Sequence, residues 1–403
     1  MRAWRPFTAA ALLLLTGCLK GTAPSRAFRI QSLVADTRES FDVALYQTMS
    51  SRLVPGHSVE LVNDGRVFDV IAEEIGKARQ SVNVVTYIWR PGKASNQLLD
   101  VLLERAKAGV KCRVLVDPIG SKHFTKDVAP RLEAAGCRAR LFRPLPADEN
   151  FARNHRKIVV VDGRVGITGG FGIHDVWLGD ADSKEEWRDT NVRVRGPAVG
   201  EMQSAFAQNW QEATGELLPP EDFPSLADDA ACAHAPGAEA TFISSTANPE
   251  VTDAERLIQL LVQSAHRRLW ISQSYFTPNP ALMQLLIDRA RAGVDVRVLA
   301  PGDENDHPEI THAQRERYEK LLGAGVQIWE WLPSMMHSKT ILVDDELGLV
   351  GSINFDRFSF GFLEEGSLLV RDRRFAGDLE ASFLRDVQRA KQVGKGKGRA
   401  SLQ

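Results

Sequence analysis

One eight-residue pattern occurs twice in this chain and constrains it more than any other feature. It spans 155–162 as HRKIVVVD and 337–344 as HSKTILVD, so both copies follow H-x-K-x-x-x-x-D. A glycine-rich turn follows each copy, at 166–170 and 348–352. Residues two apart on a strand point to the same face, so each histidine should lie beside its lysine. Two copies can bring two imidazoles and two ammonium groups together, a set suited to cleaving a phosphodiester without a metal.

The repeat extends beyond the motif. The segment AGVKCRVL at 108–115 matches AGVDVRVL at 292–299, and its glycine precedes the motif histidine by 46 and 44 residues respectively. Alternating strands and helices predict an α/β fold with a mostly parallel or mixed sheet. Apolar periodicity predicts helices at 38–51, 67–78, 96–108, 254–265 and 280–292, and strands at 82–87, 111–116, 269–275 and 294–299.

Composition places the chain among soluble globular proteins. It has 403 residues, 43% of them hydrophobic and 25% charged, with a formal net charge of −2. This near-neutral charge argues against a dedicated nucleic-acid binder, which usually carries a basic surplus. We predict a signal peptide at 1–17, an N-terminal segment at 18–55, a first domain at 56–213, a linker at 214–239, a second domain at 240–390 and a disordered basic tail at 391–403.

The N-terminus has the features of a secretory signal. A basic start precedes the apolar run Ala9–Leu15, which is too short to span a bilayer. The run ends in L-T-G-C, which resembles the bacterial lipobox, in which the cysteine (here Cys18) is lipidated. We therefore expect an exported lipoprotein anchored through Cys18 at the periplasmic face of a membrane, with the outer membrane as candidate. The alternative is an ordinary signal peptide with a chance cysteine.

Three further cysteines are Cys112, Cys137 and Cys232. An exported chain could oxidise one pair of them. Because Cys112 and Cys137 each lie near the start of a predicted strand, we expect buried free thiols. No cysteine or histidine spacing matches a metal site, and we expect no cofactor.

With their flanking segments, the paired motifs resemble the phospholipase D superfamily, and most closely its cardiolipin synthase branch. The resemblance covers roughly 56–212 and 240–390. It implies two pseudo-symmetric α/β/α sandwich domains with the active site at their interface. The matching segments are RNHRKIVVVDGRVGITGG at 153–170, WRDT at 187–190, RGPAV at 195–199, FAQNW at 206–210, YFTP at 275–278 and GSINFD at 351–356.

The resemblance also implies roles for the motif residues. His155 would be the nucleophile that forms a phosphohistidine, and His337 the general acid and base. Pseudo-symmetry leaves the reverse order open. Imidazole suits either role because its ordinary pKa of about 6.5 lets both protonation states exist near neutrality. Lys157 and Lys339 would screen the phosphate charge.

Five acidic residues are candidates for roles beside the histidines. Asp162 and Asp344 close the catalytic motifs, but their seven-residue offset from the histidine gives opposite strand parity and favours a structural role. By alignment with the family, Asp189 and Glu365 would orient the imidazoles. Glu364 competes with Glu365 for that position.

The two copies differ in their phosphate-binding residues. In the second copy, Ser352 and Asn354 follow the family pattern, and the amide of Asn354 can donate to phosphate. In the first copy, Gly172 stands where asparagine is expected. One phosphate ligand is therefore missing from the first half. The run at 355–363, rich in phenylalanine, could line an acyl channel or pack in the core.

The resemblance implies an enzyme that transfers a phosphatidyl group between two phosphatidylglycerol molecules. Export and lipidation would place its site beside a membrane, and we expect a monomer with no nucleic-acid partner. A phospholipase D hydrolase would use the same residues with water as acceptor. An exported nuclease of the superfamily is a further alternative. The non-enzymatic alternative is an idle scaffold lipoprotein, which only Gly172 supports.

Overall fold

The computed structural model describes residues 28–145, 152–224 and 236–394. The predicted signal peptide and Cys18 lie outside these ranges, as do Cys232 and parts of the predicted linker and tail. Within them, the chain forms two halves with matching element order. We use "first half" for the segment from β1 to α6 and "second half" for the segment from β9 to β16.

The elements follow the predicted alternation of strands and helices. Helix α2 (Arg38–Met49) precedes both halves. The first half consists of β1 (Val54–Asn63), α3 (Arg66–Gly76), β2 (Ser81–Thr86), α4 (Lys93–Lys107), β3 (Lys111–Val116), α5 (Ala129–Ala134), β4 (Arg138–Leu141), β5 (Arg153–Asn154), β6 (Ile158–Val161), β7 (Val165–Gly169), β8 (Thr190–Arg195) and α6 (Ala198–Thr214). The second consists of β9 (Ala238–Ser245), α8 (Asp253–Gln263), β10 (Arg268–Gln273), α9 (Pro280–Arg291), β11 (Asp295–Pro301), α10 (Pro308–Ala324), β12 (Gln327–Trp331), β13 (Lys339–Val343), β14 (Leu347–Gly351), β15 (Leu363–Arg371), α11 (Arg373–Gln388) and β16 (Ala390–Gln392).

The strands form one mixed sheet that runs through both halves. Its first-half order, β4-β3-β2-β6-β7-β8-β1, is repeated as β12-β11-β10-β13-β14-β15-β9 in the second half. Strands β2, β3 and β4 are parallel, as are β10, β11 and β12, whereas β6 and β13 pair antiparallel to β2 and β10. The halves meet where β1 pairs antiparallel with β9.

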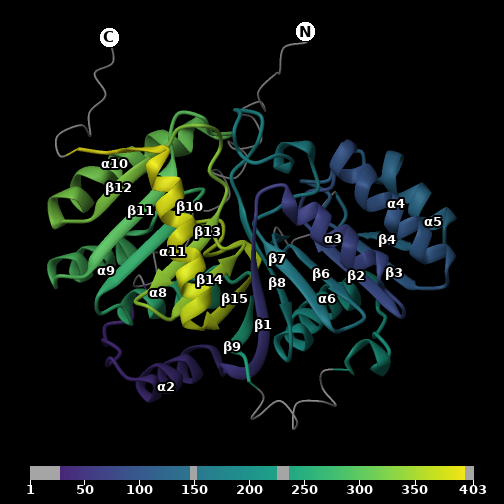
Figure 1. Cartoon of the computed structure of the whole chain (residues 1–403), viewed down its shortest axis with the longest axis horizontal. Helices are drawn as coiled ribbons and strands as arrows, with labels where there is room; N and C mark the ends of the chain where they lie inside the picture. Colours follow the sequence, from purple (N-terminus) through teal and green to yellow (C-terminus); the bar gives the residue numbers. More distant parts are fainter. Residues whose placement is uncertain (1–27, 146–151, 225–235, 395–403) are drawn as a thin grey trace.

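Helices cover both faces of each half, which confirms the predicted α/β/α fold class. Helices α3, α4 and α5 lie on one face of the first half, and α6 lies on the other (Figure 1). In the second half α8, α9 and α10 share one face and α11 crosses the opposite one. Among the described residues, none of the helices combines the length and apolarity that crossing a bilayer requires.

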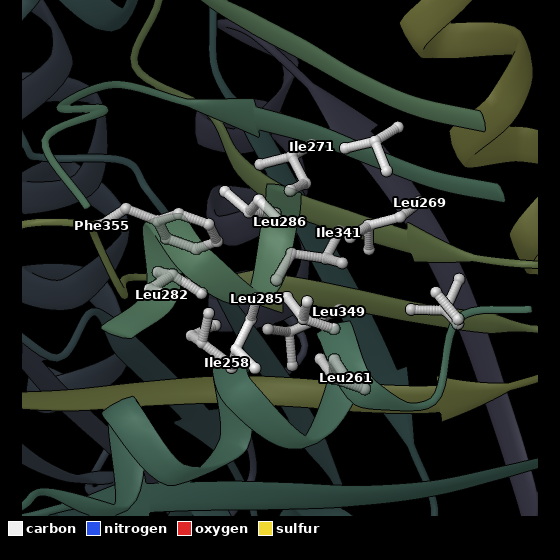
Figure 2. Packing of buried hydrophobic residues seen from close by; sticks show 14 of the residues in the cluster. Ile258, Leu261, Leu269, Ile271, Leu282, Leu285, Leu286, Ile341, Leu349 and Phe355 are labelled. Atoms are coloured by element: carbon white, nitrogen blue, oxygen red, sulfur yellow. The ribbon is translucent and has the colours of Figure 1, made fainter. Parts of the chain in front are cut away.

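The second-half core shows how apolar periodicity builds these layers. Figure 2 shows Ile258 and Leu261 of α8, with Leu282, Leu285 and Leu286 of α9, packed with residues of β10, β13 and β14. The phenylalanine run divides between core and surface. Phe355 and Phe360 belong to this core, and Phe358 is 49% exposed.

The prediction of free thiols at Cys112 and Cys137 is wrong, because the two form a disulfide with Cα atoms 4.6 Å apart. Cys112 lies on β3 and Cys137 lies immediately before β4. These strands are parallel neighbours with Arg113 opposite Arg138, so the preceding residues are also adjacent. The pairing depends on strand register, which the spacing of the cysteines does not encode.

Removing this disulfide should destabilise the first half. The bridge closes a loop with a sequence separation of 25 residues, so the double change Cys112→Ala/Cys137→Ala should lower the free energy of unfolding by about 3 kcal/mol. Urea unfolding measures the loss, and wild-type protein unfolded with a reductant should show a similar one. Equal midpoints for oxidised wild type and the double variant would contradict the prediction.

Candidate active site at the interface of the halves

Both motif histidines lie where the two halves meet. His155 and His337 precede β6 and β13, at the carboxyl-terminal ends of β2 and β10. The backbone amide of His155 donates to the carbonyl of Glu364 at 2.8 Å, and that of His337 donates to the carbonyl of Arg188 at 2.7 Å. Each histidine is therefore fixed by a residue of the other half.

The histidine–carboxylate pairs cross between the halves. His155 Nδ1 lies 2.9 Å from Glu365 Oε2, and His337 Nδ1 lies 2.9 Å from Asp189 Oδ2. All four side chains are buried. A carboxylate on Nδ1 fixes the ring and favours the tautomer that leaves Nε2 for chemistry. Neither half alone contains an oriented histidine.

Each carboxylate is itself held in place, by different groups in the two halves. Glu365 accepts hydrogen bonds from the hydroxyls of Ser352 and Ser359, the latter at 2.6 Å. Asp189 accepts from the indole N–H of Trp177 and from the backbone N–H of Thr190, both at 2.8 Å. Both histidines are thus bonded to a buried carboxylate, but different residues hold the two carboxylates in place.

The structure also separates the two candidates Glu364 and Glu365. Glu364 accepts hydrogen bonds from the side chains of Asn209 and Arg143, at 2.6 and 2.9 Å, and lies 3.2 Å from the buried guanidinium of Arg156. Because neighbouring residues of a strand point to opposite faces, only the side chain of Glu365 reaches the imidazole of His155, whereas Glu364 contacts His155 through its backbone carbonyl. Glu364 takes part in an ion network behind the site.

The lysines lie beside their histidines, as a spacing of two on an extended segment predicts. Lys157 Nζ donates to the carbonyl of His155 at 2.6 Å, and Lys339 Nζ lies 3.0 Å from His337 Nδ1. Each ammonium also faces a tyrosine ring, Tyr87 for Lys157 at 5.7 Å and Tyr275 for Lys339 at 5.9 Å. Both lysines are buried.

The charges of the two motifs act on one another. Burial lowers the pKa of His155 to about 4, and the ammonium of Lys339 in the other half contributes to that decrease. Burial also lowers the pKa of His337 well below its usual range, with further contributions from Lys339 and Lys157. The two histidines and two lysines therefore act on one another's pKa values, and an anionic phosphate bound among them would offset the positive charge of the lysines.

Burial also lowers the pKa of Lys157 to about 7 and that of Lys339 to about 8. Only the protonated amine can screen phosphate, so kcat/KM should fall as pH rises through about 7 to 8, because this ratio reports the free enzyme. Lys157→Arg and Lys339→Arg keep the charge, and together they should move this alkaline decrease to higher pH. An unchanged pH profile would show that other groups cause it.

Asp162 and Asp344 bind backbone amides at the far ends of the motif strands. Asp162 accepts hydrogen bonds from the backbone of residues 79–81, and Asp344 from that of residues 266–268. Both residues have φ near +50° in the turns after β6 and β13. We assign them a structural role, that of tying these turns to the starts of β2 and β10.

The two predicted phosphate ligands differ in their contacts. The hydroxyl of Ser352 donates to Glu365 and accepts from the Gly366 amide, and it lies 3.2 Å from the carbonyl oxygen of Gly366. We therefore assign Ser352 to positioning the carboxylate. Asn354 Oδ1 accepts from the Ser274 hydroxyl at 2.7 Å, so its Nδ2 amide is the end that can donate to phosphate.

Aromatic rings around the histidines are the part of the site that sequence reasoning missed. Tyr87 packs edge-on against His155 with ring centroids 5.3 Å apart. Trp177, Trp187 and Tyr275 surround His337 at 5.1, 5.2 and 6.3 Å. Tyr87 and Tyr275 each end a predicted strand, at 82–87 and 269–275, which offered a signal for the tyrosines. Trp177 had none.

Solved structures with little sequence identity share the fold. Phosphatidylserine synthase from Haemophilus influenzae Rd KW20 matches with a TM-score of 0.68 and 14% identity, over 88% of this chain and 92% of that one. Polyphosphate kinase from Porphyromonas gingivalis matches with a TM-score of 0.54 and 11% identity, over 94% of this chain and 53% of that one. These likenesses concern the fold alone.

Sequence relatives are more specific. Cardiolipin synthase A of Pseudomonas putida is 35% identical over 341 residues, which cover 83% of this chain and 68% of the relative. Cardiolipin synthase of Geobacillus sp. (strain WCH70) is 35% identical over 340 residues, covering 83% and 66%. The family model for the phospholipase D-like domain of cardiolipin synthase matches residues 71–210 and 257–387. The chain therefore belongs to the cardiolipin synthase branch of the phospholipase D superfamily.

Proposed function

We propose that this chain transfers a phosphatidyl group from one phosphatidylglycerol to another through a phosphohistidine, which is the cardiolipin synthase reaction. The observation that carries the proposal is the crossed pairing of His155 with Glu365 and His337 with Asp189. Family membership supports the reaction type. The buried lysines supply the positive charge that a phosphodiester requires.

In the first step, Nε2 of His155 attacks phosphorus, and the bond from phosphorus to the glycerol oxygen breaks. Its low pKa keeps His155 unprotonated at neutral pH and able to attack. His337 gives a proton to the departing oxygen, which leaves as glycerol. The phosphate anion opposes the lysine charges that lower the pKa of His337, so substrate binding favours the protonated acid.

In the second step, a hydroxyl of another phosphatidylglycerol gives its proton to His337 and attacks phosphorus. The phosphorus–nitrogen bond breaks, and His155 returns to its neutral form as cardiolipin leaves. Glu365 stabilises the positive charge that the His155 ring carries while it is bonded to phosphorus. Lys157 and Lys339 balance the charge that develops on the phosphate oxygens.

Incubation of the purified protein with phosphatidylglycerol vesicles in EDTA, and separately with DNA, tests this proposal. Cardiolipin together with an equal amount of glycerol is the expected result. Phosphatidic acid alone would identify a hydrolase, and cut DNA alone would identify a nuclease. The absence of any product would favour the scaffold alternative.

We also propose that the chain is an exported lipoprotein held at the periplasmic face of a membrane through lipidated Cys18, with the outer membrane as candidate. The lipobox-like L-T-G-C segment supports this. Cys18→Ser should move the protein from the membrane pellet to the soluble fraction on cell fractionation. A variant that stayed in the pellet would contradict the anchor.

The site needs no second copy of the chain, because both histidines and both orienting carboxylates belong to one polypeptide. We therefore propose a monomer. Light scattering of the detergent-solubilised protein should give the mass of one chain after subtraction of the detergent.

A further inference from the structure

Gly172, which stands where the family pattern has asparagine, lies against a buried tryptophan of the same half. A Cβ atom at position 172 would lie 2.8 and 2.9 Å from two ring carbons of Trp177, and 3.1 Å from Cβ of Ile88. Trp177 is 2% exposed and lies in the short 3-10 helix η2 (Asp175–Trp177). The indole thus occupies the space that an asparagine at position 172 would need, and its burial leaves the ring little room to move.

The same indole contacts the catalytic pair of the second histidine. Trp177 Nε1 donates to Asp189 Oδ2 at 2.8 Å, and this oxygen is also the one that faces His337 Nδ1 at 2.9 Å. The ring stands edge-on to His337 at 85°, with centroids 5.1 Å apart, and packs against Trp187 at 4.6 Å. Trp177 therefore restrains both members of the pair.

Among the described residues, no indole N–H donates to the carboxylate of the opposite pair, which is supported in another way. There, Glu365 is held by Ser352 and Ser359. The position that matches Ser352 in the first half is Gly170, where a Cβ would lie 2.3 Å from Asp189 Oδ1. A serine at position 170 would push the Asp189 carboxylate out of its place, and the indole N–H supplies a side-chain donor from another direction.

We propose that Trp177 is a positioning residue that holds Asp189 against His337 and so keeps the imidazole of His337, the general acid and base, in its orientation. We further propose that position 172 is glycine because a larger side chain there would overlap the indole of Trp177. The inference rests on the proposed function, since it assigns a task within that reaction. The loss of one asparagine is then no sign of an idle site. Glycine at position 172 makes room for the indole that holds the carboxylate of Asp189 in the first half.

Trp177→Phe tests the hydrogen bond, because phenylalanine keeps an aromatic ring and lacks the N–H. A lost hydrogen bond to a charged group should lower kcat roughly 10-fold or more with little change in KM. Burial raises the pKa of Asp189 to about 6, and the Trp177 bond opposes that increase. Without this bond the pKa of Asp189 should rise further. As the pH is lowered, the variant should therefore begin to lose activity at a higher pH than wild type does.

Trp89→Phe is the matched control. Trp89 is also fully buried in the first half, and its Nε1 donates to Ser95 Oγ at 2.8 Å. It should lose stability and keep the wild-type pH profile. If Trp177→Phe behaves as this control does, Trp177 is only structural and the proposal is wrong. Lack of activity in wild type would instead contradict the proposed function itself.

Coupling with position 172 gives an independent test. Gly172→Asn alone should lose most activity, because the new side chain overlaps the indole. Phenylalanine is shorter than tryptophan, so adding Trp177→Phe should raise the activity of the Gly172→Asn variant, although the same change lowers that of wild type. If Trp177→Phe lowers activity equally in both backgrounds, the two positions are not coupled and the steric part of the proposal is wrong.

Discussion

His155→Ala is expected to abolish measurable phosphatidyl transfer, with a loss of roughly 10⁴-fold or more, as found when an enzyme loses its covalent nucleophile. The imidazole of His155 is the group that would bond to phosphorus, and Glu365 orients it at 2.9 Å. The assay is the release of glycerol from phosphatidylglycerol vesicles.

His312→Ala is the control for this prediction. His312 lies on α10, and its side chain is 79% exposed. It should keep wild-type activity. Circular dichroism should show that both variants are folded. Full activity of a folded His155→Ala variant would refute the proposed mechanism.

Lys157→Met is expected to lower kcat roughly 10³-fold, the upper range for removing one group that stabilises transition-state charge. Methionine keeps an unbranched apolar side chain in the buried position and removes the ammonium. Because burial already opposes the charged form of Lys157, the variant should fold at least as stably as wild type. Its defect should therefore be seen in catalysis and not in the free energy of unfolding.

Lys107→Met serves as the comparison, since Lys107 is exposed at the end of α4. It should have wild-type kinetics. A Lys157→Met variant with nearly normal kcat would show that Lys339 alone screens the phosphate, or that screening matters less than we propose.

Much of the fold could be predicted from the sequence because the repeat is local and periodic. The strand predicted at 111–116 coincides with β3, and the helix predicted at 280–292 corresponds to α9 (Pro280–Arg291). Duplication of the surrounding segments indicated two like halves. The α/β/α fold class itself came from the family resemblance and agrees with the observed layers.

The site could be predicted only in part. A spacing of two places a lysine beside its histidine because that geometry is local. The crossed histidine–carboxylate pairs depend on contacts between the two halves. His155 and Glu365 are separated by 210 residues in the sequence, and no local pattern encodes such a partner. Likewise, the Cys112–Cys137 bridge depends on strand register. The hydrogen bond from Trp177 to Asp189 depends on how the turn that carries Trp177 packs against the site.

The central claim is that His155 bonds to phosphorus while His337 moves the protons. The most direct test is the His337→Ala variant with a phosphatidyl ester of p-nitrophenol, whose leaving group departs without a proton. The first step should then proceed and the second should fail, giving a burst of one nitrophenolate per protein and a phosphatidyl group on His155 by mass spectrometry. A phosphatidyl group found instead on His337 in the reciprocal His155→Ala variant, or continued turnover without any adduct, would contradict the account.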